Sequence, residues 1–195
     1  MITFNELKSL LRENRSVRIF RESRPVSPET LRSLVELCRF TPSGRNAQPL
    51  RYRLVYEASE RALVFPLLAW AGYYKDWAGP EEGSRPAAYL VQCLDTRVGA
   101  DCLCDDGLQL EAMGIGAATL GLRSCIIKAF NATKTAEALK LPAEYRPLYV
   151  LALGYPAETA VLEDMDGTPD ADFKYYRTPD GVHHVPKRPL SELII

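Results

Sequence analysis

Apolar stretches of strand length alternate with helical patterns along this chain, and that alternation restricts its fold more than any other feature. Residues 50–57 alternate partly between apolar and polar side chains, as a half-buried strand does. Residues 87–94 and 147–155 are continuous apolar runs of strand length, and a helical pattern at about 100–120 lies between them. Strands and helices that interleave in this way predict an α/β or α+β sandwich with a sheet at its centre.

The beginnings of two earlier helices are marked by capping residues. Thr3 and Glu6 have the spacing of a capping box, and apolar residues follow on one helical face. Ser27 followed by Pro28 predicts a second helix with the serine as its N-cap. A shorter helix is expected over residues 133–140, before Pro142.

The helix expected at about 100–120 contains three glycines, each of which costs about 1 kcal/mol relative to alanine. A helix that tolerates them is expected to pack closely against another element. Its expected buried face consists of Leu103, Leu110, Met113, Ala117 and Leu120.

Length and charge exclude several classes of protein. A chain of 195 residues is expected to form a single domain, 1–195. The formal net charge is −1, so there is no general positive field for nucleic acid or an anionic membrane. The first twenty residues lack the apolar core of a signal peptide, and we expect a cytoplasmic protein. Five cysteines without zinc-ligand spacing predict neither a disulfide framework nor a metal site.

The chain offers few residues for protein-borne catalysis. Its two histidines, His183 and His184, would point to opposite faces of an extended segment. No serine lies in a nucleophile elbow, and Gly114-Ile-Gly116 lacks the third glycine of a dinucleotide fingerprint. We therefore expect no catalytic side chain, and an enzyme of this sequence would use a cofactor for its chemistry.

Two segments nevertheless combine residues suited to ligand binding. In residues 14–18, Asn-Arg-Ser-Val-Arg, an extended backbone would direct Ser16 and Arg18 to one side, where a hydroxyl and a guanidinium could bind a phosphate or a planar acceptor. A solvated basic turn is the alternative. Residues 42–49, Pro-Ser-Gly-Arg-Asn-Ala-Gln-Pro, combine prolines, a glycine, a hydroxyl and two amides, although an ordinary polar loop would also have this composition.

Together these segments resemble the nitroreductase family of flavin enzymes. The match runs from Arg15-Ser16-Val17-Arg18-Ile19-Phe20 through Pro25-Val26 to Pro42-Ser43, Asn46 and Gln48-Pro49. Residues 111–125, 151–156 and 186–188 also resemble family segments, so the likeness covers nearly the whole chain. The resemblance implies an α+β fold, with a mainly antiparallel central sheet flanked by helices, in an intertwined homodimer that binds FMN at the subunit interface.

The resemblance also implies the residues of the site. Arg18 would stabilise negative charge near the N1 and O2 edge of the flavin ring, the backbone of 126–129 would pass over the ring, and residues 42–46 would come from the partner subunit. Lys187 and Arg188 would hold the phosphate. The cofactor-binding residues so implied are Asn14, Arg15, Ser16, Arg18, Pro42, Ser43, Gly44, Asn46, Ile127, Lys128, Ala129, Lys187 and Arg188.

This sequence departs from the family pattern at several positions of that site. Asn14 replaces the usual first arginine, which weakens the phosphate clamp, and Arg123 replaces a frequent glycine. Lys128-Ala129 replaces a pair that often carries glycine and could reshape the substrate side of the flavin.

The activity implied is an FMN-dependent oxidoreductase with NAD(P)H as co-substrate. Hydride would pass to FMN N5 and then to an oxidised acceptor such as a nitroaromatic or a quinone, in a ping-pong scheme. The alternatives are a flavoprotein of the same fold that does not use NAD(P)H, either a dehydrogenase or a flavin-consuming enzyme, and an FMN-binding protein without catalysis.

Overall fold

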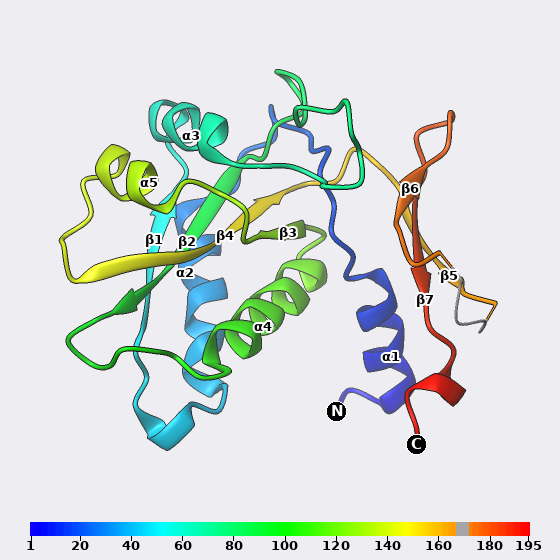
Figure 1. Cartoon of the computed structure of the whole chain (residues 1–195), viewed down its shortest axis with the longest axis horizontal. Helices are drawn as coiled ribbons and strands as arrows, with labels where there is room; N and C mark the ends of the chain where they lie inside the picture. The colour runs from blue at the N-terminus through cyan, green and yellow to red at the C-terminus, as the bar shows by residue number, and fades with distance from the viewer. Residues whose placement is uncertain (167–171) are drawn as a thin grey trace.

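The computed structural model describes residues 1–166 and 172–195 and is built around a four-stranded antiparallel sheet (Figure 1). The strand order is β1-β2-β4-β3, and every neighbouring pair is antiparallel. The sandwich with a central, mainly antiparallel sheet is therefore confirmed. The strands are β1 (Leu50–Val55), β2 (Ala88–Asp95), β3 (Arg123–Ile127) and β4 (Tyr145–Gly154).

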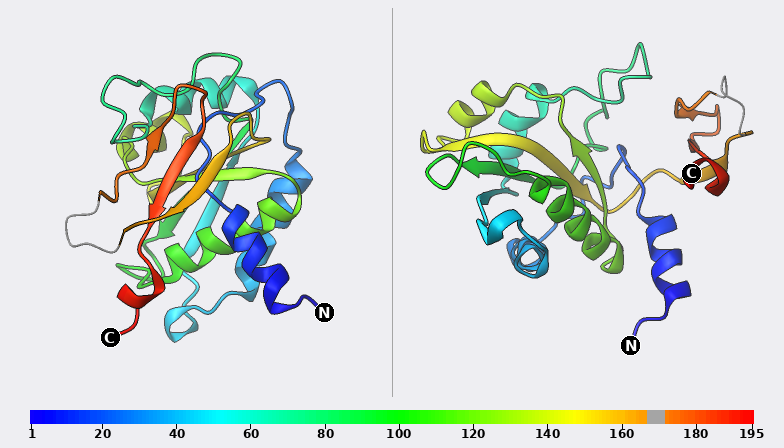
Figure 2. Two further views of the ribbon diagram at one scale, coloured as in Figure 1. Left: turned by 90° about the vertical axis from the view of Figure 1, so that its right-hand side faces the viewer. Right: turned by 60° about the horizontal axis from the view of Figure 1, so that its bottom comes forward.

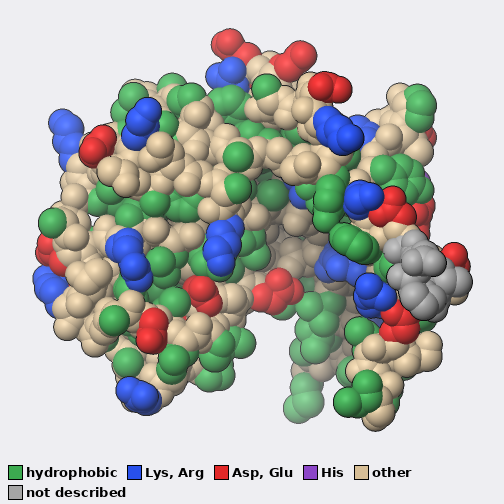
Figure 3. Space-filling model, in the orientation of Figure 1, with side chains coloured by type: hydrophobic (Ala, Val, Ile, Leu, Met, Phe, Trp, Pro, Cys, Tyr) green, Lys and Arg blue, Asp and Glu red, His purple; other side chains and the backbone are tan. Residues whose placement is uncertain are grey.

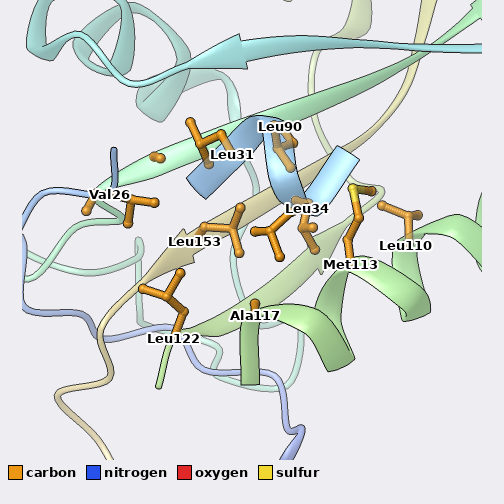
Figure 4. Packing of buried hydrophobic residues seen from close by; sticks show 12 residues of the cluster. Val26, Leu31, Leu34, Leu90, Leu110, Met113, Ala117, Leu122 and Leu153 are labelled. Carbon is orange, nitrogen blue, oxygen red and sulfur yellow. The ribbon is translucent and has the colours of Figure 1, made fainter. Parts of the chain in front are cut away.

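Helices cover both faces of this sheet (Figure 2, right). One face packs against α2 (Pro28–Leu37) and α4 (Asp105–Thr119), and Figure 4 shows leucines of α2, β2 and β4 meeting Leu110 and Met113 of α4. The opposite face packs near α3 (Ala58–Val64) and α5 (Ala132–Ala138). Every residue of β2 is buried because both faces are covered, and this explains why its sequence is mostly apolar, with only Gln92 and Asp95 polar.

A second, three-stranded sheet is formed by the C-terminal part of the chain. Its order is β5-β7-β6, with β5 (Ala160–Asp164) parallel to β7 (His183–Lys187) and β6 (Tyr176–Arg177) antiparallel to it. Figures 1 and 2 show this sheet standing beside the N-terminal helix α1 (Phe4–Glu13), apart from the central sheet. The remaining short helices are 3₁₀ turns: η1 (Cys38–Phe40), η2 (Gly44–Asn46), η3 (Phe65–Leu67) and η4 (Leu190–Glu192).

The capping signals are confirmed at both early helices. Thr3 and Glu6 form the reciprocal capping box of α1, and the Ser27 side chain accepts from Thr30 N at the start of α2. Although α1 is amphipathic, it buries none of its own residues, and Leu7 and Phe4 remain 38% and 78% exposed. Its apolar face therefore lacks a cover within the described chain.

The start of the long helix and part of its buried face were predicted wrongly. The helix begins at Asp105 rather than at about residue 100, because Leu103 adopts a positive φ of 52° that interrupts a helix. Leu103 and Leu120 are 61% and 51% exposed, since the first lies before the helix and the second forms its C-cap. Leu110, Met113 and Ala117 are buried as expected.

Close packing of α4 is confirmed at one of its glycines. A Cβ added to Gly116 would lie 2.3 Å from Cδ1 of Leu37 on α2, so the two helices approach more closely than alanine would permit. A Cβ on Gly114 would lie 3.2 Å from Nδ2 of Asn14. The glycines of α4 thus allow both α2 and residues 14–18 to pack closely against this helix.

No helix among the described residues has both the length and the apolar composition needed to cross a membrane.

Candidate flavin site

Residues 14–18 run along the free edge of β3, which is the outermost strand of the central sheet. Ser16 forms an isolated parallel bridge with Ser124, and the Val17 backbone N–H donates to Ser124 O over 3.1 Å. The capped helix α1 ends at Glu13, so it delivers this segment directly to the strand edge. The sheet edge therefore positions the first of the two candidate segments.

A cavity of about 50 Å³ lies where this segment meets α4. Arg15 donates from Nη2 to Leu11 O over 2.7 Å, but its Nε is buried and has no hydrogen-bond partner among the described residues. An unpaired buried donor costs about 1–3 kcal/mol, so an acceptor on a bound ligand would stabilise this site. The cavity is lined by Asn14, Arg15, Ser16, Leu110, Glu111, Gly114, Ser124 and Ile126.

The electrostatics of the cavity are mixed. Burial lowers the pKa of Arg15, while the negative charge of Glu111 opposes that shift. Asn14 donates from Nδ2 to Glu111 Oε1 over 3.3 Å, so the residue that replaces the family arginine is engaged by a carboxylate. A carboxylate in this position suits hydroxyl donors better than it suits a phosphate.

The strand β3 presents alternate residues to the cavity and to the core. Ile126 is 43% exposed on the cavity side, whereas Ile127 is 5% exposed and packs into the core on the other face of the sheet. The Ser124 carbonyl points away from β4 toward Val17, so by strand alternation the N–H of Ile126 also faces outward. Lys128 and Ala129 follow the strand and are exposed, with Lys128 Nζ 5.4 Å from the Tyr149 ring centroid.

Arg18 turns away from this cavity and toward the C-terminal sheet. Its side chain is nearly buried, with the residue 8% exposed, and its guanidinium carbon lies 4.7 Å from the Tyr175 ring centroid. Its Nη1 is 3.1 Å from His183 Nε2 on β7. Arg18 is not among the described residues that line the Arg15 cavity, so the structure does not bring these two arginines together in one pocket.

The backbone next to Arg18 is held by a carboxylate of the C-terminal segment. Glu158 accepts from the N–H groups of Arg18 and Ile19, and its second oxygen accepts from Arg177 Nη2 over 2.5 Å. Three charge-assisted hydrogen bonds on one buried carboxylate fix the position of residues 17–19 relative to β6. We call Arg18, Glu158, Arg177 and His183, with Tyr74 and Tyr175, the Arg18 cluster.

The second candidate segment forms a strained loop at the N-terminus of α4. Asp105, 1% exposed, accepts from the Ser43 hydroxyl over 2.5 Å and from Gly44 N–H over 2.9 Å. Arg45, Asn46 and Gln48 all have positive φ, between 50° and 55°. Three such conformations within four residues cost free energy and are typical of functional sites, which argues against an ordinary polar loop.

Within one chain this loop does not join the Arg15 cavity. Asp105 holds the loop, and the nearest cavity-lining residue of α4 is Leu110, five residues further along the helix and therefore about 7.5 Å away along its axis. None of residues 42–49 lines the cavity. Pro42 and Asn46 are exposed, and Ser43 and Gly44 are half-buried.

The expected phosphate ligands lie at the end of β7. Lys187 is exposed and pairs in register with Asp164, and Arg188 forms a 2.6 Å ion pair with Glu192. Lys187 follows His183 by four strand residues, about 13 Å along β7. The two basic residues are thus near each other but do not line the Arg15 cavity.

An apolar groove of about 570 Å³ separates α1 from α2 and α4. Figure 3 shows a notch in the surface here, with hydrophobic side chains along α1. Ile2, Leu7, Leu37 and Phe40 contribute to its lining. An exposed apolar groove of this size is typical of an interaction surface.

The sequence did not identify several residues that build these sites. Glu111 and Ser124 lie in segments that resemble the family, but helix and strand patterns give no sign that they reach a cavity. Glu158, Tyr74 and His183 come from distant parts of the chain, and only the folded structure brings them to Arg18. The prediction that His183 and His184 face opposite sides is confirmed, because His184 binds Glu163.

Comparison with known proteins confirms the resemblance to nitroreductases. Residues 11–87, which include both candidate segments, match the Nitroreductase family model. A protein of Leptothrix cholodnii named "Putative NADH dehydrogenase/NAD(P)H nitroreductase" is 38% identical over 74 residues. That match covers 38% of this chain and 37% of the relative, so the chain is aligned with little more than a third of the relative's length.

Solved structures show the same fold over most of the chain. A nitroreductase family protein of Streptococcus pneumoniae has a TM-score of 0.63 and 18% identity, and covers 89% of this chain and 96% of its own. An FMN-dependent nitroreductase of Clostridium difficile has a TM-score of 0.63 and 18% identity, over 76% and 86% of the two chains. The NADPH:FMN oxidoreductase of Vibrio harveyi, solved with NAD⁺, has a TM-score of 0.61 and 20% identity, over 77% and 68%. The chain therefore has the nitroreductase fold.

Proposed function

We propose that this protein is an FMN-dependent oxidoreductase that oxidises NAD(P)H and reduces an acceptor such as a nitroaromatic or a quinone. The family match over residues 11–87 and the fold support this class. The single observation that carries the proposal is the unpaired, buried Arg15 Nε in a cavity at the free edge of β3.

The residues of this cavity fit the polyol and ring edge of FMN. Arg15 Nε and the exposed Ser16 offer donors, and Glu111 accepts from hydroxyl groups. The outward N–H of Ile126 and the chain beyond it supply backbone donors for the ring edge. A side chain at Gly114 would meet Asn14 and Ser124, so glycine keeps this wall open.

The phosphate would be held by Lys187 and Arg188. A phosphate monoester carries about −1.5 to −2 charges at neutral pH and therefore needs a local basic cluster in a chain whose net charge is −1. Arg188 would exchange its ion pair with Glu192 for the phosphate.

Bound FMN would accept a hydride and pass its electrons to the acceptor, while the protein supplies position and charge. The resemblance assigns to Arg18 the stabilisation of negative charge on the ring, and this role would require its guanidinium to leave His183 and turn toward the Arg15 cavity. Ile126 and Lys128 would limit access to the ring from the strand side, and Lys128 would bias the pocket toward acceptors that carry negative charge. No side chain is required as a nucleophile. A cytoplasmic location remains a prediction of the sequence.

We further propose a homodimer in which residues 42–46 reach the partner's flavin site. Pro42, Ser43, Gly44 and Asn46 belong to the strained loop, which does not line the Arg15 cavity of its own chain. The apolar groove and the uncovered face of α1 supply a surface for association. Dimerisation would thus complete two sites at once.

The first experiment is the visible spectrum of the purified protein, with FMN added if it is colourless, before and after anaerobic NADPH and then NADH. Flavin bands that bleach with a nucleotide support the proposal and identify the donor. Bands that neither nucleotide bleaches favour a flavoprotein of this fold that does not use NAD(P)H. FMN that binds without any catalysed reduction favours a binding protein, and failure to take up FMN contradicts the site.

The variant Arg15→Ala tests the cavity directly. Loss of a charge-assisted hydrogen bond of about 1.5–3 kcal/mol should raise the Kd for FMN about ten- to hundredfold. Arg12→Ala is the matched control, because Arg12 is an exposed arginine on α1, three residues before Arg15. Equal FMN binding by the two variants would remove Arg15 from the site.

Sedimentation tests the dimer. Leu7→Glu would place a charge in the apolar groove and should shift the protein to a monomer, with loss of FMN binding. Leu63→Glu is the control, since Leu63 is 51% exposed on α3. A stable monomer of the unmodified protein at micromolar concentration would contradict the shared site.

A further inference from the structure

A second cavity, which the function proposed above does not use, is also lined by Arg15. It has a volume of about 240 Å³, ample for a small oxyanion, because a single water needs only about 10–15 Å³ of such space. It lies between the end of α1, the start of β3 and the chain that leads into β5. We call it the Arg123 cavity, and its lining consists of Glu13, Arg15, Val17, Arg123, Pro156, Glu158, Thr159 and Ala160.

The register at the edge of β3 places two arginines next to each other. Ser16 forms a parallel bridge with Ser124, so Arg15 and Arg123, one residue earlier in each segment, are neighbours across the same edge. Both side chains line the Arg123 cavity. Like charges that face each other across adjacent strands are destabilising, so this pair favours an anion between the two guanidinium groups.

Both guanidinium groups keep N–H donors for such an anion. Arg123 donates from Nη1 to Leu122 O over 2.8 Å and from Nη2 to Glu13 Oε2 over 3.3 Å, which together use two of its five N–H donors. Arg15 Nε is buried and has no hydrogen-bond partner among the described residues. An oxyanion that accepts from both groups would form the charge-assisted hydrogen bonds that guanidinium groups favour.

Two carboxylates line the same cavity, but only one of them is free to move. The Glu158 side chain is 2% exposed, and Arg177 and two backbone N–H groups hold it, so its charge is already balanced. The Glu13 side chain is 60% exposed at the C-terminal end of α1, where the helix dipole disfavours negative charge. Exposed ion pairs contribute little to stability, so an incoming anion can replace Glu13 at Arg123.

The charge of the two arginines matches a phosphate monoester. Such a group carries about −1.5 to −2 charges at neutral pH and has three acceptor oxygens, whereas a carboxylate carries a single charge. Once Glu13 is displaced, Arg15 and Arg123 together offer a charge of +2. Arg123 stands where the family frequently has glycine, so this second cation is a feature of this chain.

We propose that Arg15 and Arg123 bind a phosphate monoester group in the Arg123 cavity. The proposed function supplies two sources of such a group, the phosphate of FMN and the 2′-phosphate of NADPH, and this choice of ligands rests on it. The binding of a phosphate by the two arginines rests only on the geometry described above.

Pairs of ligands that differ only in the phosphate test the proposal in Arg123→Met. The Kd values for FMN and riboflavin are measured on flavin-free protein, and those for NADP⁺ and NAD⁺ on protein loaded with FMN. In at least one pair, the phosphate-bearing ligand should bind about tenfold more weakly and its partner less than twofold more weakly.

The affected pair identifies the source of the phosphate. A selective loss for FMN would place the flavin phosphate in this cavity instead of at Lys187 and Arg188, and a selective loss for NADP⁺ would assign the cavity to the nucleotide. Equal changes within both pairs, in a variant shown to be folded by circular dichroism, would overturn the proposal.

Two further variants separate ligand binding from a structural role of the ion pair. Glu13→Gln removes the competing carboxylate and should strengthen binding of the same phosphate-bearing ligand at least twofold, whereas weaker binding would overturn the proposal. Arg32→Met is the matched control, because Arg32 is an exposed arginine of α2 that forms an ion pair with Glu29. It should leave all four Kd values unchanged.

Titration with inorganic phosphate separates this inference from the proposed function. The NMR signals of the Nε–H groups of Arg15 and Arg123 in flavin-free protein should both shift at millimolar phosphate. A protein that binds neither flavin nor nucleotide would refute the proposed function, and the phosphate titration would then decide the inference alone. Shifts of both signals would support the site, and unchanged signals would overturn it.

Discussion

The central sheet and the C-terminal sheet of this protein are stabilised in different ways. The central strands β2 and β4 are covered on both faces by two apolar clusters. The strands β5, β6 and β7 are mostly half-buried or exposed, and their connection to residues 17–19 depends on Glu158 and His183. Apolar burial is non-directional and insensitive to pH, whereas the polar contacts depend on geometry and charge. The candidate site therefore lies where the central sheet, stabilised by apolar burial, meets a C-terminal segment held by a few polar contacts.

The largest effect is expected in the central sheet. Leu151→Ala removes a fully buried side chain of β4 and should lower the free energy of unfolding by about 2–5 kcal/mol. Val185→Ala on the half-buried strand β7 should cost less than about 1 kcal/mol. Urea denaturation measures both, and equal losses would contradict the difference between the two sheets.

Glu158→Gln is expected to release the C-terminal sheet without unfolding the central sheet. The change removes the charge that binds Arg177 and two backbone N–H groups, at a cost of about 2–3 kcal/mol. Hydrogen exchange should accelerate in residues 172–187 while β2 remains protected. Uniform acceleration throughout the chain would show that the two sheets unfold as one unit. Glu137→Gln, a change to an exposed carboxylate of α5, is the control.

The stability that the Arg18 cluster contributes should depend on pH, whereas the stability of the apolar central sheet should not. The pKa of His183 is lowered to about 4 in the folded protein from about 6.5, so the unfolded chain binds a proton first as pH falls. The stabilisation is complete above pH 6.5 and declines as pH falls toward 4. Between pH 7 and 5 the free energy of unfolding should fall by about 1–2 kcal/mol. His183→Gln should remove this decline, and persistence of the decline in that variant would assign it to other groups.

A small effect on stability is expected at the strained loop. Ser43→Ala removes the hydroxyl that donates to Asp105 and accepts from Gln48 N–H, a loss of about 1 kcal/mol. FMN binding should weaken more than this, because the loop would no longer hold its conformation for the partner's site. Ser59→Ala, at an exposed serine of α3, is the control. Unchanged FMN affinity in Ser43→Ala would separate the loop from the flavin site.

Much of the fold was predictable because local sequence and burial agree. The capping box at Thr3 and Glu6 and the apolar runs of β2 and β4 all appear where the patterns indicate them. The start of α4 was predicted wrongly because the positive φ of Leu103 prevents the helix from beginning before Asp105. The periodicity of side chains does not reveal such a backbone conformation. The exposure of α1 was likewise not predictable, since amphipathicity shows which face should be covered but not by what.

The candidate site was predictable only in part. The segments 14–18 and 42–49 were identified from their residues and their family resemblance, and the structure shows one at a strand edge and the other in a strained loop. Neither pattern indicated that Arg18 would turn to β7 rather than to the Arg15 cavity. That choice depends on Glu158 and His183, which are 140 and 165 residues away along the chain.

The sequence by itself therefore determined the class of fold, the caps and strands that build it, and the two segments that resemble a flavin site. These features depend on local conformational propensity and on the spacing of apolar residues. Both can be recognised within short stretches of the sequence. Only the tertiary structure decided which charges become neighbours: Glu111 beside Arg15, and a neutral His183 beside Arg18. Electrostatic interactions act through space and depend on burial, so their outcome is set by the folded arrangement and not by spacing along the chain.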